Sequence, residues 1–303
     1  MRKRLYQLND NRKLTTEMKK IIIITSMLLP MAIQAQILNV NSIKQLPITG
    51  DDNRANQAVA ISSQGDYLLL TTDARQGLVK WDIATSQSTV LATESVNGSE
   101  VSISDDGSQV TYEKVSYQGK RRHQEVQSID LKTGERKAVA SASRQRQAPA
   151  RLADASSSDR PVLSHHHLKL YITRDGVTRQ LAPNGEEERY IWSSLSPDGS
   201  KVLYYVSGWG AYVCDIDGNN VISMGNITAP RWWDDSTIVG MRETDDEYTI
   251  TASLIVARTL DGNEQTLTGN DVIATYPLPC KQSGKIAFST PDGSIYVIDV
   301  TSE

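Results

Sequence analysis

Residues 196–205 read Ser-Pro-Asp-Gly-Ser-Lys-Val-Leu-Tyr-Tyr, which is a tight turn followed directly by an apolar run rich in β-forming side chains. Shorter versions of this turn stand at residues 63–65 (Ser-Gln-Gly), 105–107 (Asp-Asp-Gly) and 282–284 (Gln-Ser-Gly), each between two short extended stretches. Recurrence at intervals of about 40 residues is typical of repeat proteins, and repeats built from short strands stack into β-propellers. The turns therefore predict an all-β chain made of repeated units.

The units align on these turns. The first two predict four strands each, at residues 58–61, 67–71, 78–82 and 88–91, and at residues 101–103, 110–112, 126–130 and 136–139. The third is degenerate: residues 154–159 replace its turn, and strands are predicted at residues 161–163, 168–172 and 177–181. Units four and five cover residues 190–224 and 227–267. Each complete unit is one antiparallel blade.

The sixth unit ends at residue 300 after three strands, whereas residues 37–40 and 43–46 are extended and belong to no unit. A strand from the start of the chain would complete the last blade and pair two edges that would otherwise be open. We therefore expect a six-bladed β-propeller of four-stranded antiparallel blades, closed by the amino-terminal strand, over residues 36–303. No segment remains to supply a seventh blade.

The start of the chain predicts export. Met-Lys-Lys at residues 18–20 precedes an apolar run to residue 33 and then Gln-Ala-Gln, the pattern of a signal peptide, here residues 18–35 with cleavage near Ala35. The run is shorter than the roughly 20 residues that span a bilayer, and no later segment is predicted to span one. We expect residues 1–17 to be a mis-annotated leader, and the mature chain to lie in the periplasm or, alternatively, outside the cell.

The charge of the chain restricts its partners. The whole sequence has a formal net charge of −4, and without residues 1–35 it would carry 25 basic and 34 acidic side chains, a net charge near −9. Because long basic runs are missing from this acidic chain, nucleic acid and anionic membranes are not expected as its main partners.

The fourth unit carries a family resemblance. The turn at residues 196–199, its apolar strand, and Ala-Tyr-Val-Cys-Asp-Ile-Asp-Gly at residues 211–218 resemble the WD40-like (PD40) repeat of TolB-like six-bladed propellers. The resemblance covers nearly all of residues 36–303 and implies a periplasmic protein that binds other envelope proteins. The amino-terminal α/β domain of the TolB family is not present in this sequence.

The alignment also places both cysteines. Cys280 shares a column with Ile61 and Leu195, and Cys214 shares one with Trp81 and Ile129, so both columns are apolar. The two cysteines belong to blades four and six, too far apart for the roughly 5.5 Å between Cα atoms that a disulfide needs. We expect two buried, unreactive thiols.

Loops that join the second and third strands of a blade emerge on one face of a propeller. The predicted face carries a basic loop in blade two, an acidic loop in blade five, and a Gly-Trp-Gly turn in blade four; its candidate interaction residues are Lys120, Arg121, Arg122, His123, Trp209, Glu243, Asp245, Asp246 and Glu247. Opposite charges on two loops steer a partner more than they add affinity. Trp209 is either exposed or covered by a neighbouring loop, and the basic loop is either a docking element or a solvated hairpin tip.

A metal site is the sharpest chemical alternative, because residues 165–167 are three consecutive histidines and imidazole binds Zn, Ni or Cu. Since neighbouring side chains of a strand point to opposite faces, only His165 and His167 could share one ion. A polar hairpin turn explains the same residues without a metal. We expect no cofactor.

The sequence lacks the signatures of common enzymes. It contains no Gly-x-Ser-x-Gly, no His-Glu-x-x-His and no phosphate-binding loop. Some propellers of related sequence cleave uronates or gate serine peptidases, but the peptidases need a further domain and the uronate enzymes a histidine-rich funnel, and only His123 lies outside the cluster. We expect no enzymatic activity.

Aromatic side chains near the starts of the inner strands form either a ligand platform or ordinary packing between blades; they are Tyr190, Trp192, Trp232, Trp233 and Tyr276, with Arg231 among them. For Trp232 we expect packing. Taken together, these features predict an exported, monomeric, non-enzymatic propeller that acts as an interaction scaffold or recognition module for another envelope protein. The alternative is a carbohydrate-binding or metal-dependent, lyase-like propeller.

Overall fold

The structure is a computed structural model that describes residues 36–48, 56–72, 74–140, 160–245 and 250–302. The chain divides into two units, Met1–Ala35 and Gln36–Glu303. The first unit lies outside the described residues, so the leader, the signal peptide and its cleavage site stay predictions. In the part of the chain that is described, no helix has the length and apolar character to cross a membrane.

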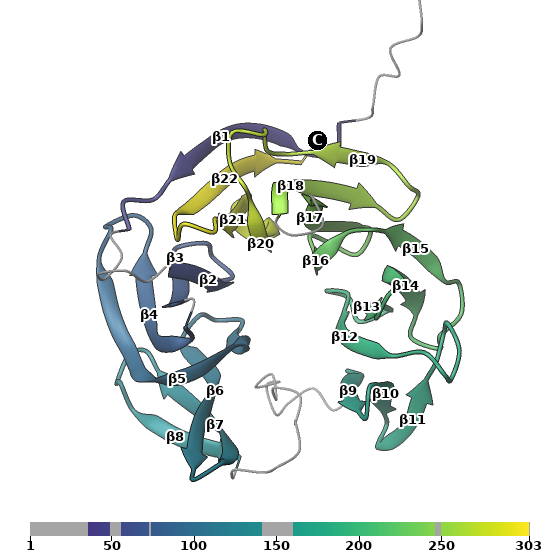
Figure 1. Ribbon diagram of the computed structural model, residues 1–303, viewed down its shortest axis with the longest axis horizontal. Coiled ribbons are helices and arrows are strands. Elements are labelled where there is room, and N and C mark those ends of the chain that lie inside the picture. The colour runs from purple at the N-terminus through teal and green to yellow at the C-terminus, as the bar shows by residue number, and fades with distance from the viewer. Residues whose placement is uncertain (1–35, 49–55, 73, 141–159, 246–249, 303) are drawn as a thin grey trace, which may run out of the picture. The chain divides into compact units, whose positions relative to one another are not determined.

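The described residues of the second unit form six antiparallel blades that follow one another around a centre (Figure 1). Blade one contains β2 (Asn56–Ile61), β3 (Tyr67–Thr72), β4 (Gln76–Asp82) and the first part of β5 (Ser88–Ile103). Blade two contains the rest of β5, β6 (Gln109–Gln118), β7 (Arg121–Asp130) and β8 (Arg136–Ala140). Blade three has three described strands, β9 (Val162–His166), β10 (Lys169–Arg174) and β11 (Val177–Leu181).

The last three blades have four strands each. Blade four contains β12 (Tyr190–Leu195), β13 (Lys201–Val206), β14 (Gly210–Asp215) and β15 (Ile222–Gly225). Blade five contains β16 (Thr228–Trp232), β17 (Thr237–Asp245), β18 (Ile250–Thr259) and β19 (Glu264–Thr266). Blade six contains β20 (Thr275–Cys280), the short 3-10 helix η1 (Lys281–Ser283), β21 (Lys285–Ser289), β22 (Ile295–Thr301) and β1 (Asn39–Gln45). The predicted fold class is confirmed.

Closure by the start of the chain is also confirmed. β1 pairs with β22 over Asn39↔Thr301 to Gln45↔Tyr296, with a register shift between Val40 and Ser42. Leu38, just before the strand, is 1% exposed and packs in the core of blades five and six. The first and last described strands thus belong to one sheet.

The connection between blades one and two differs from the prediction. Residues 88–91 and 101–103 were expected as two strands, but they are the ends of one 16-residue strand, β5. Val90 pairs with Val79 of blade one, and Ser102 pairs with Thr111 of blade two. The same strand is therefore the outer strand of one blade and the inner strand of the next.

The recurrent turns of the second and fourth units owe their shape to one aspartate each, Asp106 and Asp198. In the fourth unit, Asp198 Oδ1 accepts hydrogen bonds from Ser196 Oγ (2.6 Å) and from the amide of Ser200 (2.9 Å), and Gly199 adopts a positive φ of 76°. Glycine adopts this left-handed conformation at little steric cost. Hydrogen bonds that favour the ionised form, from Ser196 first, hold the pKa of the Asp198 carboxyl well below its usual range.

These turns, which join the first and second strands, also bind neighbouring blades to one another. The contacts are Ser63 Oγ to Asp105 O (2.7 Å), Asp198 N to Asp235 Oδ1 (2.8 Å), Lys281 Nζ to Asp234 Oδ2 (2.8 Å) and Cys280 Sγ to Ser63 O (3.0 Å). We call the turns that make these contacts the linked turns. They fix one end of the blades, which leaves the opposite end to carry loops of different length.

The core lies between blades, where their faces pack. Tyr67, Leu69 and Leu78 of blade one form one cluster with Val110 and Tyr112 of blade two. Burial of such side chains contributes roughly 1.5–3 kcal/mol each. The apolar residues of the repeated units thus serve the packing of blade on blade.

Both cysteines lie where the alignment placed them. Cys214 pairs with Val202 and is 1% exposed, and Cys280 is 7% exposed; neither is in a disulfide. Burial raises the pKa of the Cys214 thiol to about 12, so this thiol stays protonated and unreactive at neutral pH.

Candidate interaction face

The end of the blades opposite the linked turns carries the hairpins that join second to third strands. We call it the hairpin face and define it by the turns at residues 119–120, 167–168 and 207–209. These turns share one end because, in an antiparallel sheet, successive connections alternate between the two ends. The amide of Tyr190 donates to Leu168 O (2.8 Å), which ties the hairpin of blade three to the start of blade four.

The hairpin of blade two is long. β6 and β7 have ten residues each and stay paired from Gln109↔Asp130 to Gln118↔Arg121, whereas β13 and β14 of blade four have six each. Gly119, with a φ of 64°, turns the chain at the tip. We call residues 115–125 the blade-two hairpin. It carries the predicted Lys120, Arg121 and Arg122 as exposed residues, and a half-buried His123.

A buried carboxylate lies at the base of this hairpin. Glu113 Oε1 is 3.8 Å from Arg122 Nη2, and the Glu113 side chain is only 5% exposed, against 46% for Arg122. Asn97 Nδ2 also donates to Glu113 Oε1 (3.3 Å), as does Gln124 Nε2. Arg122 is thus held from one side while its side chain stays partly exposed to solvent.

The indole of Trp209 is exposed rather than covered by a neighbouring loop. It is 64% exposed in the turn between β13 and β14, where its amide donates to Val206 O (3.0 Å). The flanking Gly208 and Gly210 have φ values of 83° and 109°. A Cβ on Gly210 would stand 2.8 Å from the carbonyl oxygen of Gly225, so the sequence around this tryptophan suits the turn that presents it.

The acidic candidates of blade five lie only partly in the described residues. Glu243 and Asp245 lie at the carboxyl end of β17. Glu243 Oε2 accepts a hydrogen bond from Thr228 Oγ1 (2.8 Å). Asp246 and Glu247 lie outside the described residues. β17 and β18 are nine and ten residues long, so blades two and five both extend their second and third strands beyond those of blade four.

The three histidines occupy different surroundings. His165, on β9, places Nδ1 3.1 Å from Tyr190 O and Nε2 2.8 Å from Ser193 Oγ, both in blade four. Since a carbonyl only accepts, Nδ1 carries a proton and donates it to Tyr190 O. His167 lies in the two-residue turn with a φ of 48°, and its ring centroid is 3.9 Å from that of His166. No group of three or more His, Cys, Asp or Glu side chains suited to a metal occurs among the described residues.

The aromatic residues of the inner strands divide in two. Tyr190 and Trp233 are buried, and Trp232 packs in the core between blades four and five, where its Nε1 is 3.4 Å from Ser194 O. The packing expected for Trp232 is confirmed. Trp192, in contrast, lies under the guanidinium of Arg231 at 5.5 Å, and Tyr276 is 49% exposed with a φ of 53°.

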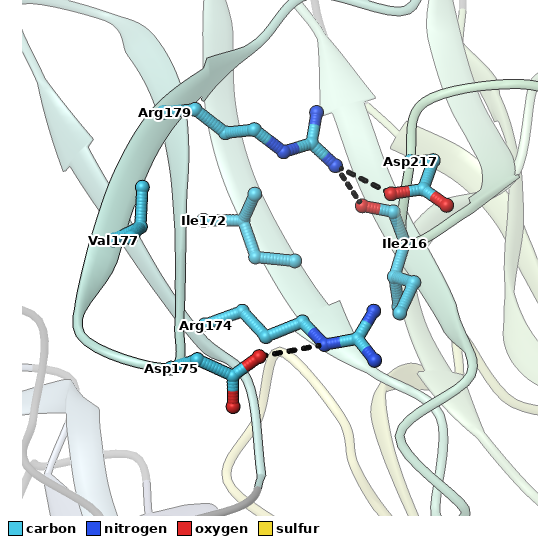
Figure 2. A pocket seen from close by; sticks show the side chains of 7 residues that line it. All are labelled: Ile172, Arg174, Asp175, Val177, Arg179, Ile216 and Asp217. Carbon is cyan, nitrogen blue, oxygen red and sulfur yellow. Dashed lines mark hydrogen bonds and ion pairs between the residues drawn. The ribbon is translucent and has the colours of Figure 1, made fainter.

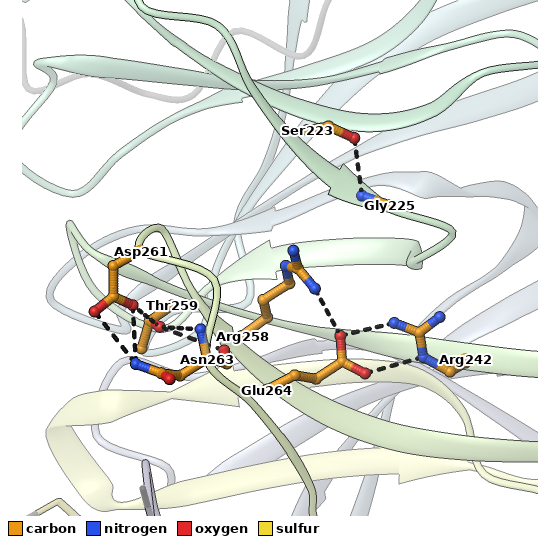
Figure 3. A network of polar contacts seen from close by, with 8 residues as sticks. All are labelled: Ser223, Gly225, Arg242, Arg258, Thr259, Asp261, Asn263 and Glu264. Atoms are coloured by element: carbon orange, nitrogen blue, oxygen red, sulfur yellow. Dashed lines mark hydrogen bonds and ion pairs between the residues drawn. The ribbon is translucent and has the colours of Figure 1, made fainter. Parts of the chain in front are cut away.

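Two further polar sites lie away from the hairpin face. A hollow of about 280 Å³ lies between blades three and four (Figure 2). There Arg179 Nη2 donates hydrogen bonds to Ile216 O and Asp217 Oδ1, both at 2.9 Å. In blade five, Glu264 accepts two hydrogen bonds from Arg242 (3.0 and 2.7 Å) and one from Arg258 (3.1 Å) (Figure 3). Burial alone would raise the pKa of Glu264, but these arginines lower it below its usual range.

The sequence prediction missed Tyr117. This side chain is 67% exposed, lies in the blade-two hairpin and pairs directly with Arg122 across the ribbon. Strict pairing of the extended run 109–118 with 121–130 depends on a turn at Gly119, and that glycine was the signal available in the sequence.

Comparison with known proteins gives the fold alone. No family model matches the chain, and no curated protein matches it. Among solved structures, a TolB candidate from Agrobacterium tumefaciens is 16% identical with a TM-score of 0.55, covering 88% of this chain and 99% of that one. TolB from Acinetobacter baumannii (14% identity, TM-score 0.46, 84% of this chain and 66% of that one) and an oligogalacturonate lyase in complex with manganese (15%, 0.47, 80% and 76%) are also similar. The chain thus shares a β-propeller fold with the TolB candidate from Agrobacterium tumefaciens.

Proposed function

We propose that the chain is an exported, non-enzymatic propeller that recognises another protein of the cell envelope through its hairpin face. The observation that carries this proposal is the exposed Trp209, presented between two glycines at the end of the blades opposite the linked turns. Tryptophan, tyrosine and arginine dominate protein-binding hot spots. An indole that is 64% exposed can bury a large apolar area when a partner covers it.

The division between the two ends of the blades supports the same proposal. At one end, the linked turns tie blade to blade through short contacts such as Asp198 N to Asp235 Oδ1 (2.8 Å). At the other end, the hairpins of blades two, four and five differ in length and charge. Binding residues are typically carried by loops on a rigid scaffold, which is the arrangement of this face.

We include in the proposal that the chain acts in the periplasm or outside the cell, as a monomer, without a cofactor. The predicted signal peptide supports export. The surroundings of the histidines favour a binding protein over a metal-dependent lyase, because Nδ1 and Nε2 of His165 contact Tyr190 and Ser193. The carbonyl of Tyr190 and the hydroxyl of Ser193 thus hold His165 in the contact between blades three and four.

Site-specific photocrosslinking in envelope extracts tests the proposal. A photoreactive amino acid at position 209 samples the hairpin face, and the same residue at Glu135, exposed in the turn after β7, samples the opposite end of the blades. We expect one protein to crosslink in stoichiometric yield from position 209 and not from position 135. Equal crosslinking from both positions, or none from position 209, would refute a partner-binding hairpin face.

A further inference from the structure

The blade-two hairpin has a charge opposite to that of the chain. Lys120, Arg121 and Arg122 lie within residues 115–123, which contain no acidic residue, whereas the full sequence has a net charge of −4. All three are exposed. Such a local positive potential attracts anionic groups and raises the rate at which they meet the protein.

The geometry adds a specific contact surface to this charge. Tyr117 and Arg122 are directly paired across the ribbon, so their side chains lie on the same face about 4.5–5.5 Å apart at Cβ. Tyr117 is 67% exposed, and Glu113 holds Arg122 from behind at 3.8 Å. A phenol ring beside a pre-positioned guanidinium offers one apolar contact and one fork of donors for a carboxylate.

The rest of the hairpin face determines the shape of the ligand. Glu243 and Asp245 lie on the long second strand of blade five, which also reaches this face. A flat anionic surface that approached Arg121 and Arg122 would meet these carboxylates as well and be repelled. A narrow acidic chain can contact the blade-two hairpin alone.

We propose that the blade-two hairpin binds a carboxylate-rich segment of the partner protein. Arg122 pairs with an acidic side chain on the face of the ribbon that also presents Tyr117, which packs against the segment, and Arg121 pairs with another acidic side chain from the opposite face. The inference rests on the proposed function and names the chemistry of the partner. It also assigns the positive charge of this hairpin to binding rather than to solubility.

Fluorescence anisotropy with defined peptides tests the inference. The probe is a labelled peptide with Asp or Glu at alternate positions, and its control carries Asn and Gln there. We expect the mature chain to bind the acidic probe at least about tenfold more tightly than the amide probe, which corresponds to about 1.4 kcal/mol, and to lose this preference as salt rises. Equal affinity for both probes would overturn the inference.

Two charge-reversed variants locate the binding. Arg121→Glu with Arg122→Glu removes the proposed contacts, whereas Lys132→Glu with Lys137→Glu makes the same change in charge at the opposite end of blade two, where both lysines are exposed. We expect about tenfold weaker binding only in the first variant. Similar losses in both variants would reduce the effect to net charge and refute a specific site.

Two further measurements separate the remaining explanations. Tyr117→Ala should lower the affinity for the acidic probe severalfold without changing its salt dependence. An unchanged affinity would show that Tyr117 does not contact the peptide. Vesicles containing phosphatidylglycerol should not compete with the probe, and binding of vesicles in its place through the same arginines would overturn the inference in favour of a membrane. Photocrosslinking at position 209 does not use these arginines, so a partner found there together with failure of the acidic probe would refute this inference alone.

Discussion

Replacement of Gln265 by alanine should release the start of the closing strand. Gln265 Oε1 accepts hydrogen bonds from the amides of Ile37 (2.7 Å) and Leu38 (2.9 Å), and its Nε2 donates to Leu38 O (2.7 Å). The Gln265 side chain thus makes the backbone hydrogen bonds at Ile37 and Leu38 that a neighbouring strand would otherwise make. At a net contribution of about 0.5–1.5 kcal/mol per hydrogen bond, Gln265→Ala should lower the free energy of unfolding by about 2–4 kcal/mol.

Urea unfolding of the mature chain measures this effect, and hydrogen exchange at the Leu38 amide locates it. Gln45→Ala is the matched control, because Gln45 is an exposed glutamine of the closing strand with one bond, Nε2 to Ser294 Oγ (3.1 Å); its loss should cost less than about 0.5 kcal/mol. Faster exchange at Leu38 is expected only in Gln265→Ala. If both variants unfold at the same urea concentration, Gln265 does not hold the strand and the reasoning fails.

Other residues give predictions of the same kind. Gly210→Ala should destabilise the chain by about 2–3 kcal/mol in urea unfolding and Gly208→Ala by about 1, since only at Gly210 does a Cβ meet a backbone oxygen, at 2.8 Å, in addition to a positive φ. The pKa of Asp106 is lowered from 3.8 to about 2, chiefly by hydrogen bonds from two serines, so its ionised form stabilises the fold above pH 3.8 and this contribution is lost as pH falls toward 2. Urea midpoints should therefore fall less over this range in Asp106→Asn than in the wild type, and an equal fall would contradict the assignment. Cys214 should react with a thiol reagent only at the rate of unfolding, whereas a cysteine introduced at Trp209 should react at once in the folded chain; fast labelling of both would show that blade four is open.

Much of the fold could be predicted because the turns are local. An aspartate that accepts from a serine two residues before it, followed by a glycine with positive φ, is contained within residues 196–200 and needs no tertiary contact to be recognised. The closing strand was predictable by counting, since the sixth unit had three strands. The continuity of β5 could not be predicted, because its two ends look like strands in the sequence whether or not the residues between them are also extended.

The candidate site was harder to predict because exposure depends on neighbours. The sequence placed Trp209 in a turn, but only the packing of the surrounding hairpins determines whether its indole is covered. His165 shows the opposite case: three consecutive histidines suggest a metal, yet His165 makes its contacts with Tyr190 and Ser193 of the next blade. Such contacts join segments more than 20 residues apart and leave no local pattern.

The continuous β5 determines where this chain can be cut. Its residues serve two blades at once, through Val90↔Val79 on one side and Ser102↔Thr111 on the other, so new termini placed within it would divide one element between two sheets. The short connection from Gly225 to β16 joins two separate sheets instead. A circular permutant of residues 36–303 should therefore not begin within β5, and Asn39 and Thr301, which pair through β1 and β22, need only a short linker between the ends that they flank.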